Sequence, residues 1–287
     1  MKWLVRDLFT PQILKKMKTK KILFTDLDGT LLTSDKKVSQ TDYDSIEQII
    51  NEGHRFVFVT GRPLFSVMKI AEEFGFIKDG FFIAAFNGAQ VYDPYNQKMI
   101  FEHTMPYEYC EYLYRIGRKE DLTLVTYTDT NVVVERKTDD ALFYSNRIKM
   151  PLIVSENFKD ALSHEPAKVL AINRESKQSL EHFRQAVASF EEGRLNSVFS
   201  CPFLLEYSMP EATKGNAVRF FCDYFDIPIE NAVACGDEEN DISMLKAAGT
   251  GVAMQNGTDL VKANADYITG YSNDENAITE VINRFFR

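Results

Sequence analysis

The sequence is poor in cysteine motifs and long apolar runs, and each absence removes a class of protein. Its four cysteines, Cys110, Cys201, Cys222 and Cys235, form no CxxC pair, so neither a zinc ribbon nor a disulfide framework is indicated and we expect reduced, buried thiols. No stretch approaches the ~18 apolar residues that a membrane span needs, and the N-terminus lacks the apolar segment of a signal peptide. We therefore expect a cytoplasmic protein without a membrane span.

Positive charge is also scarce. Lys and Arg total 33 against 42 Asp and Glu, and the net charge of -9 repels polyanions, so we expect no nucleic-acid partner. A small anionic substrate is not excluded, because its site needs only a few local positive charges. With 287 residues, of which 45% are hydrophobic, the chain is long enough for one large domain or two smaller ones.

The order of predicted strands and helices divides the chain into a sheet domain and an insertion. From residue 21 onward, apolar strands alternate with helices that begin near Ser39 and Pro63, which predicts a parallel sheet. Hairpins dominate after residue 88, and the strand and helix alternation returns near residue 210. We predict an α/β fold in which a Rossmann-like parallel-sheet core (residues 21–88 and 209–287) is split by an inserted α+β cap domain (89–208) and preceded by an extension (1–20).

The extension carries apolar side chains at loosely helical spacing, interrupted by Pro11 and followed by a basic run. A short helix packed on the protein body, a frayed end, a docking helix and a membrane-surface helix all fit this pattern. The oligomeric state is left open as well.

Two carboxylates follow the first predicted strand, in LFTDLDGTLL. Asp26 and Asp28 emerge at the carboxyl end of that strand, where open α/β sheets bind ligands, and Gly29 allows a tight turn with N–H groups facing an anion. Asp26 is ionised at neutral pH and needs no base to act as a nucleophile, while Asp28 is placed to give and take a proton. A lone Asp-x-Asp is more often a solvated turn.

Two further segments offer groups that bind phosphate. In VFVTGRP, Thr60 and Gly61 stand between a strand and a helix, where a hydroxyl and a backbone amide can donate to phosphate oxygens, and Arg62 either contacts phosphate or lies on the surface. In EATKGNAV, Lys214 opens a helix, and its ammonium would relieve repulsion between phosphate and carboxylates of about 4 kcal/mol per charge pair at ~4 Å. An ordinary turn and a surface lysine are the alternatives.

Carboxylates gather again in AVACGDEENDISML, where a strand runs into Gly236 and Asp237 as a helix opens. Mg²⁺ prefers one or two protein carboxylates, substrate phosphate and retained waters, and Asp26 together with Asp237 can supply that set. An acidic helix start, stabilised by the helix dipole, is the alternative.

All four segments follow predicted strands, in the order Asp-x-Asp, Thr-Gly, Lys-Gly and Gly-Asp-x-x-Asn-Asp. In this the sequence resembles the haloacid dehalogenase-like (HAD) phosphatases, in particular the Cof-type branch with an inserted α/β cap. The matching motifs are DLDGTLL, VTGR, NGA, KG and GDEENDISML, and the resemblance covers residue 21 onward. Thr25 departs from the pattern, since an apolar residue is more common there.

The resemblance implies a Mg²⁺-dependent phosphatase that acts on a small phosphorylated metabolite, such as a sugar phosphate, a nucleotide or a cofactor phosphate. It implies that Asp26 forms an aspartyl phosphate, that Asp28 serves as general acid and base, and that Thr60 and Lys214 contact phosphate. Mg²⁺ would be held by Asp26, the backbone carbonyl of Asp28 and Asp237, supported by Asn240 and Asp241. Asn87 matches a position that often faces substrate, although an Asx turn fits it nearly as well.

Other functions fit the sequence less completely. A phosphomutase would use the same Asp26 chemistry, and only cap and lid would distinguish it. A non-catalytic module would lack some of these groups, a dehalogenase would have no use for Asp28 or Asp237, and an ion-pumping ATPase would need membrane spans. Specificity should come from the cap, where tyrosines either line a pocket or form core: Tyr107, Tyr109, Tyr112, Tyr114, Tyr127 and Tyr144.

Overall fold

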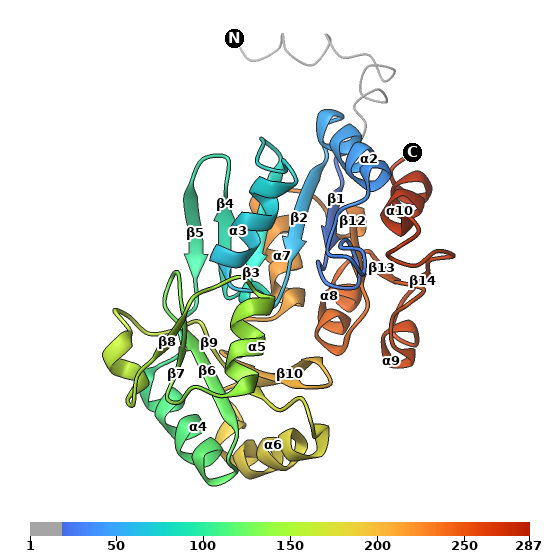
Figure 1. The fold of residues 1–287 in the computed structure, drawn as a ribbon. Helices are drawn as coiled ribbons and strands as arrows, with labels where there is room; N and C mark the ends of the chain where they lie inside the picture. Colours follow the sequence, from blue (N-terminus) through green and yellow to red (C-terminus); the bar gives the residue numbers. More distant parts are fainter. Residues whose placement is uncertain (1–18) are drawn as a thin grey trace, which may run out of the picture.

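The computed structural model describes residues 19–287, which form two sheets in two adjoining modules (Figure 1). The predicted extension at residues 1–20 lies outside the described residues except for its last two. None of the helices in residues 19–287 is long and apolar enough to cross a membrane.

The core sheet has eight strands. The first six in the order given next are parallel to one another, and the last two form an antiparallel hairpin. Its strand order is β14 (Tyr267–Ile268), β13 (Thr250–Ala253), β12 (Ala232–Gly236), β1 (Ile22–Thr25), β2 (Arg55–Val59), β3 (Phe81–Ala85), β4 (Gln90–Asp93) and β5 (Lys98–Glu102). The helices of this module are α2 (Gln40–Asn51), α3 (Leu64–Glu73), α7 (Lys214–Phe225), α8 (Ile242–Ala247), α9 (Asp259–Lys262) and α10 (Ala277–Phe285). The α/β fold with a parallel-sheet core is confirmed.

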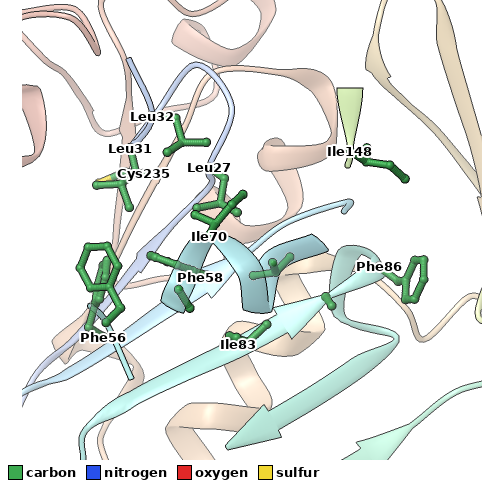
Figure 2. Close-up of a cluster of buried hydrophobic side chains, with 14 of the residues drawn as sticks. Leu27, Leu31, Leu32, Phe56, Phe58, Ile70, Ile83, Phe86, Ile148 and Cys235 are labelled. Atoms are coloured by element: carbon green, nitrogen blue, oxygen red, sulfur yellow. The ribbon is translucent and has the colours of Figure 1, made fainter. Parts of the chain in front are cut away.

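Both faces of the core sheet are buried, as continuous apolar strands predict. Successive side chains of β2 point to opposite faces: Phe56 and Phe58 join one cluster (Figure 2), while Val57 and Val59 join the other. Helices α2, α3 and α10 cover the first face, and α7, α8 and α9 cover the second. Ser39 caps α2 by accepting a hydrogen bond from the backbone of Asp42, as expected.

The hairpin β4–β5 extends the core sheet, whereas we expected it in the inserted cap. Phe86, Asn87 and Gly88 all have positive φ (50°, 57° and 97°), so the chain reverses directly after β3. The next strand therefore returns antiparallel beside β3, and β5 pairs with β4. We propose that the cap begins after β5, near Pro106, rather than at residue 89.

The cap contains a six-stranded, mostly antiparallel sheet with helices on both faces. Helices α4 (Tyr107–Lys119) and α6 (Lys177–Glu191) pack on one face, and α5 (Asp139–Arg147) lies on the other, which faces the core. The ring centroids of Phe86 in the core and Tyr127 in the cap are 5.0 Å apart, and both residues belong to one apolar cluster that runs from the core into the cap. The strand order is β10 (Asn196–Cys201), β11 (Leu204–Ser208), β9 (Lys168–Ile172), β6 (Thr123–Tyr127), β7 (Val132–Val134) and β8 (Leu152–Val154).

Candidate functional site

Neighbouring parallel strands bring the predicted motifs to one edge of the core sheet. Asp26 follows β1, Asp237 follows β12 and Thr60 follows β2, and these three strands are adjacent. The backbone N–H of Asp26 donates to the carbonyl of Cys235 (3.0 Å), so the two acidic segments leave the sheet side by side. Residues far apart in the chain thus meet because the carboxyl ends of parallel strands share an edge.

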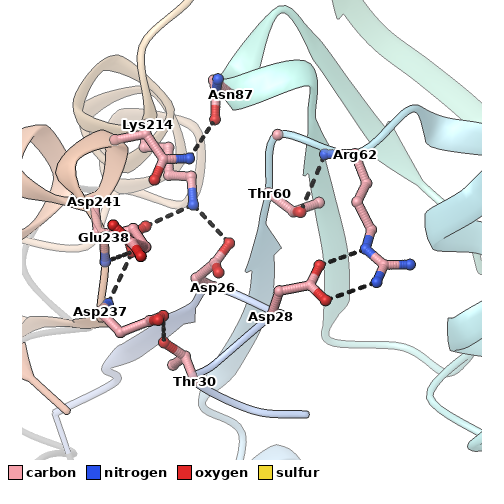
Figure 3. A network of polar contacts seen from close by, with 12 residues as sticks. Asp26, Asp28, Thr30, Thr60, Arg62, Asn87, Lys214, Asp237, Glu238 and Asp241 are labelled. Atoms are coloured by element: carbon pink, nitrogen blue, oxygen red, sulfur yellow. Dashed lines mark hydrogen bonds and ion pairs between the residues drawn. The ribbon is translucent and has the colours of Figure 1, made fainter. Parts of the chain in front are cut away.

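Lys214 lies at the centre of this group (Figure 3). Its Nζ donates to Asp26 Oδ1 and to Asp241 Oδ1, both at 2.6 Å, and its side chain is fully buried. Burial alone would lower the pKa of Lys214, but the charges of Asp241 and Asp26 outweigh that effect and raise it. The lysine is therefore charged and fixed between two carboxylates.

Three buried carboxylates face one another around this lysine. One oxygen from each of Asp26, Asp237 and Asp241 lies within 4.8 Å of the others. Burial, with Asp241 adding to it, raises the pKa of Asp26 to about 7 despite Lys214, and burial and Asp241 raise the pKa of Asp237 well above its usual range. Such crowding of hard oxygen donors at one sheet edge fits a divalent cation such as Mg²⁺.

The turn after β1 shapes the same cluster. Gly29 has φ of +81°, and a Cβ built on it would lie 2.2 Å from Asp237 Oδ2, so a side chain there would displace the carboxylate. Thr30, which we did not single out, donates from Oγ1 to Asp237 Oδ1 at 2.7 Å. Position 29 therefore requires glycine for the close approach of two loops.

The Asp28 side chain points away from the three carboxylates and binds two cations. Arg62 donates to it twice (Nε to Oδ2 at 2.6 Å and Nη2 to Oδ1 at 2.8 Å), and Lys36 Nζ lies 2.8 Å from Oδ1. Burial raises the pKa of Asp28, but Arg62 and Lys36 together outweigh it and hold this pKa well below its usual range. Arg62 is thus neither a surface residue nor free for phosphate in this arrangement.

Hydrogen bonds link three further predicted residues, Thr60, Asn87 and Asn240, beside the acidic cluster. Thr60 Oγ1 accepts from the backbone N–H of Arg62 (3.2 Å), and the backbone N–H of Asn87 donates to the Thr60 carbonyl (2.8 Å). Asn240 Nδ2 donates to Asn87 Oδ1 (3.1 Å), and Asn87 Nδ2 donates to Glu206 Oε2 (2.6 Å). Asn87 is therefore held by a network between core and cap as well as by its turn.

A cavity of about 50 Å³ lies between this edge and the cap. That volume admits a few waters or a phosphoryl group and is far below the ~300 Å³ of a site for a whole metabolite. Tyr144 lines it, with Tyr127 hydrogen-bonded behind (2.6 Å between hydroxyls), whereas the four tyrosines of α4 belong to the interior of the cap or its margin. The lining residues are Asp26, Asp28, Thr60, Gly61, Arg62, Tyr144, Arg147, Ile148, Ser200, Leu204, Glu206, Glu238 and Asn240.

Two cap residues near this site were missed from sequence. Lys168 and Glu206 are charged yet buried, with relative exposures of 1% and 4%. The available signal was a single charge inside an otherwise apolar strand, in AKVLAI and in FLLEYS. Lys36 was missed because nothing in its surface-like segment indicates that it folds back onto Asp28.

A parallel-sheet core, a second sheet module that covers it and acidic side chains at the strand ends together define a Rossmann-like α/β enzyme with a cap. A sequence model of the haloacid dehalogenase-like hydrolases matches residues 23–282. The chain belongs to this family, and it is a phosphatase of the Cof-type branch.

Individual relatives agree with that assignment. The chain is 28% identical over 267 residues to putative phosphatase YxeH of Bacillus subtilis (strain 168), covering 91% of this chain and 97% of that protein. It is 27% identical over 274 residues to the 5-amino-6-(5-phospho-D-ribitylamino)uracil phosphatase YitU of the same organism, covering 94% and 99%. Among solved structures, a haloacid dehalogenase-like hydrolase from Bacteroides thetaiotaomicron superposes with a TM-score of 0.83 at 30% identity, covering 93% and 99%.

Proposed function

We propose that this phosphatase transfers the phosphoryl group of a small phosphorylated metabolite to Asp26 and then to water, with Mg²⁺ as cofactor. One observation carries the proposal: the Asp26 carboxylate, buried beside Lys214 and two further aspartates, lies on the wall of a cavity sized for a phosphoryl group. Burial raises the pKa of Asp26 to about 7, above the value expected from sequence, and a Mg²⁺ bound beside it would lower that pKa again. The charged carboxylate, held in place by the Lys214 ammonium, would then be suited to attack phosphorus.

Asp26 and Asp237, with the backbone carbonyl of Asp28, would hold the Mg²⁺, which offsets the repulsion between phosphate and carboxylates. Asp241 and Asn240 support the site from behind, because Asp241 fixes Lys214 and also accepts from the backbone N–H groups of Asp237 (2.9 Å) and Glu238 (3.0 Å). Thr60, Gly61 and Lys214 are the proposed phosphate contacts.

The two steps exchange one proton through Asp28. An Asp26 oxygen bonds to phosphorus while the bond to the leaving oxygen breaks, and that oxygen takes the proton of Asp28. Water then attacks the same phosphorus, gives its proton to Asp28 and releases phosphate from Asp26. Because Arg62 and Lys36 keep Asp28 charged in the arrangement seen here, the first step requires these cations to turn toward the substrate phosphate.

The substrate is proposed to be a phosphate ester of a sugar, a nucleotide or a cofactor precursor. The relative YitU, whose name specifies a phosphoribitylamino-uracil, supports the last of these. The decisive assay measures phosphate release from a panel of such esters and from p-nitrophenyl phosphate, with and without Mg²⁺. Conversion of one isomer to another without phosphate release would indicate a phosphomutase instead.

Asp26→Asn tests the nucleophile. It should lower Mg²⁺-dependent phosphate release by at least about a thousandfold, because a neutral amide is a far weaker nucleophile than a carboxylate. Asp44→Asn, on an exposed turn of α2, is the matched control and should leave turnover unchanged. Full turnover by the Asp26 variant would refute the mechanism.

A further inference from the structure

A charged pair from the cap is buried against the phosphate-binding turn of the core. Lys168 at the start of β9 and Glu206 in β11 lie on adjacent antiparallel strands, and Lys168 Nζ is 2.9 Å from Glu206 Oε2. Their side chains are 1% and 5% exposed. A buried ion pair recovers its desolvation cost only when its remaining hydrogen-bonding groups are also satisfied, so the other contacts of the pair matter.

Those contacts are made to the core. Lys168 Nζ donates to the backbone carbonyl of Gly61 at 2.5 Å, and Glu206 Oε2 accepts from Asn87 Nδ2 at 2.6 Å. A Cβ built on Gly61 would lie 3.0 Å from Glu206 Oε1, so the absence of a side chain there allows the carboxylate to approach. The pair therefore joins the cap to the two core segments that follow β2 and β3.

The Gly61 carbonyl belongs to the peptide that links Gly61 to Arg62. The N–H of the same peptide donates to Thr60 Oγ1 (3.2 Å), so Lys168 and Thr60 hold the peptide from both ends. Arg62 continues from that peptide to the Asp28 carboxylate. Lys168 therefore holds the backbone from which the Arg62 side chain reaches Asp28 here, and from which it would turn toward the substrate phosphate.

Charge adds to this geometry. Burial lowers the pKa of Lys168, Glu206 opposes that effect, and nearby Lys214 lowers the pKa further, so the two ammonium groups are close enough to repel each other. A bound phosphate between them would relieve the repulsion.

We propose that Lys168 and Glu206 are positioning residues, through which the seated cap sets the Thr60–Arg62 turn and Asn87 in the geometry needed for phosphoryl transfer. The inference rests on the proposed function and extends it: the cap completes the phosphate site as well as covering it. Cap closure and assembly of the reactive geometry are then one event.

Lys168→Met removes the ammonium and keeps most of the side chain. With Mg²⁺ and p-nitrophenyl phosphate, kcat should fall by at least about tenfold while KM changes less than about threefold, because orientation is lost rather than substrate contact. Glu206→Gln, which keeps the shape and the acceptor for Asn87, should lower kcat by less. The double variant should be no slower than the slower single variant, because the pair acts as a unit.

The matched control is a second ion pair between cap and core, Lys149 with Glu73 (3.5 Å), whose side chains are 68% and 55% exposed. Lys149→Met should leave kcat within about twofold. A Lys168→Met variant with unchanged kcat and a lowered unfolding temperature would overturn the inference, as would additive losses in the double variant. Should Lys168→Met fail to fold, Glu206→Gln with unchanged kcat would overturn it too.

Failure of this inference is distinguishable from failure of the proposed function. If Asp26→Asn is inactive and Lys168→Met is fully active, only the role of the cap pair is lost. If Asp26→Asn retains turnover, the covalent mechanism itself is lost.

Discussion

At the scale of single residues, the acidic cluster opposes the stability of the protein that carries it. Asp26, Asp237 and Asp241 are buried within reach of one another, and Lys214 compensates only part of their charge. In ion-binding sites, such repulsion between carboxylates commonly destabilises the folded protein as long as no ion is bound. The consequence is measurable as stability that depends on metal and pH.

Asp237→Asn should therefore stabilise the metal-free protein at pH 8, raising its Tm by about 2–4 °C, or about 1 kcal/mol. The pKa values of Asp26 (about 7) and Asp237 are raised in the folded state, so the stability that the two protonated groups contribute is complete below about pH 4. It is lost as pH rises through each raised pKa, which for Asp26 is about 7. The advantage of the variant should grow over that range. Thermal unfolding from pH 5 to 8 measures it.

The same variant should lose the stabilisation that added Mg²⁺ gives the wild-type protein, since a ligand that binds only the folded state raises Tm. Asp44→Asn serves again as control and should respond to Mg²⁺ like the wild type. An Asp237→Asn variant that is less stable than the wild type at pH 8 without metal would contradict this picture of the cluster.

Most of the residues at the carboxyl-terminal edge of the core sheet could be predicted from sequence, because each prediction needs only the residues next to it in the chain. Asp26, Thr60 and Asp237 each come directly after an apolar strand, so their shared location follows from the parallel sheet. The partners of Asp28 did not follow, because the reach of Arg62 and Lys36 depends on side-chain conformation. The roles of these residues in catalysis stay predictions.

At the scale of elements, α7 places Lys214 at its first residue. Thr213 caps the helix by accepting from the backbone N–H of Asn216 at 3.1 Å, which fixes the direction in which the helix starts. The capped first turn thereby directs the lysine at the acidic cluster.

Thr213→Ala should lower the free energy of unfolding by about 1 kcal/mol and reduce kcat as well, because Lys214 sits in the frayed turn. Thr213→Ser keeps the cap and should restore both. Ser39→Ala, which removes the comparable cap of α2, should cost similar stability while leaving kcat unchanged. Equal activity losses in the two alanine variants would argue against a specific role of α7. Urea unfolding and steady-state kinetics are the measurements.

Elements with strong apolar patterns were predicted, and weak or exposed ones were not. The strands corresponding to β1, β2, β3 and β12 were expected because every residue in them, or all but one, is buried. The short edge strand β8 was missed because it is only half-buried, and α5 was missed despite Thr138 and two acidic residues at its start. Tyr144, on α5, was named as a candidate pocket residue, but Arg147 on the same helix was missed.

At the scale of the whole molecule, the cap must separate from the core in each catalytic cycle. The cavity of about 50 Å³ accommodates a phosphoryl group but not a complete metabolite. With natural esters, kcat should therefore fall as sucrose raises solvent viscosity, because opening for product release limits the rate. Asp28→Asn, in which the chemical steps become slow, should show no such dependence, and equal dependence in both proteins would contradict the prediction.

The split core and its insertion were predictable, because strand and helix alternation stops and resumes along the chain. The position of the cap on the core could not be predicted, because it depends on contacts of single side chains, such as Lys168 with Gly61 and Lys149 with Glu73. No periodic pattern encodes such contacts. The pairing of β4 and β5 with the core sheet could not be predicted either, because it depends on three consecutive positive-φ residues in the turn after β3.

The central pairing of the core sheet has a consequence for biosynthesis. β1 pairs along its whole length with β12, Ile22 against Ala232, so the strand that leads to Asp26 is synthesised long before its partner, which leads to Asp237. The cap, a continuous stretch between them, can fold while the ribosome is still extending the chain. The acidic cluster can therefore form only after β12 has left the ribosome, when the cap is already complete.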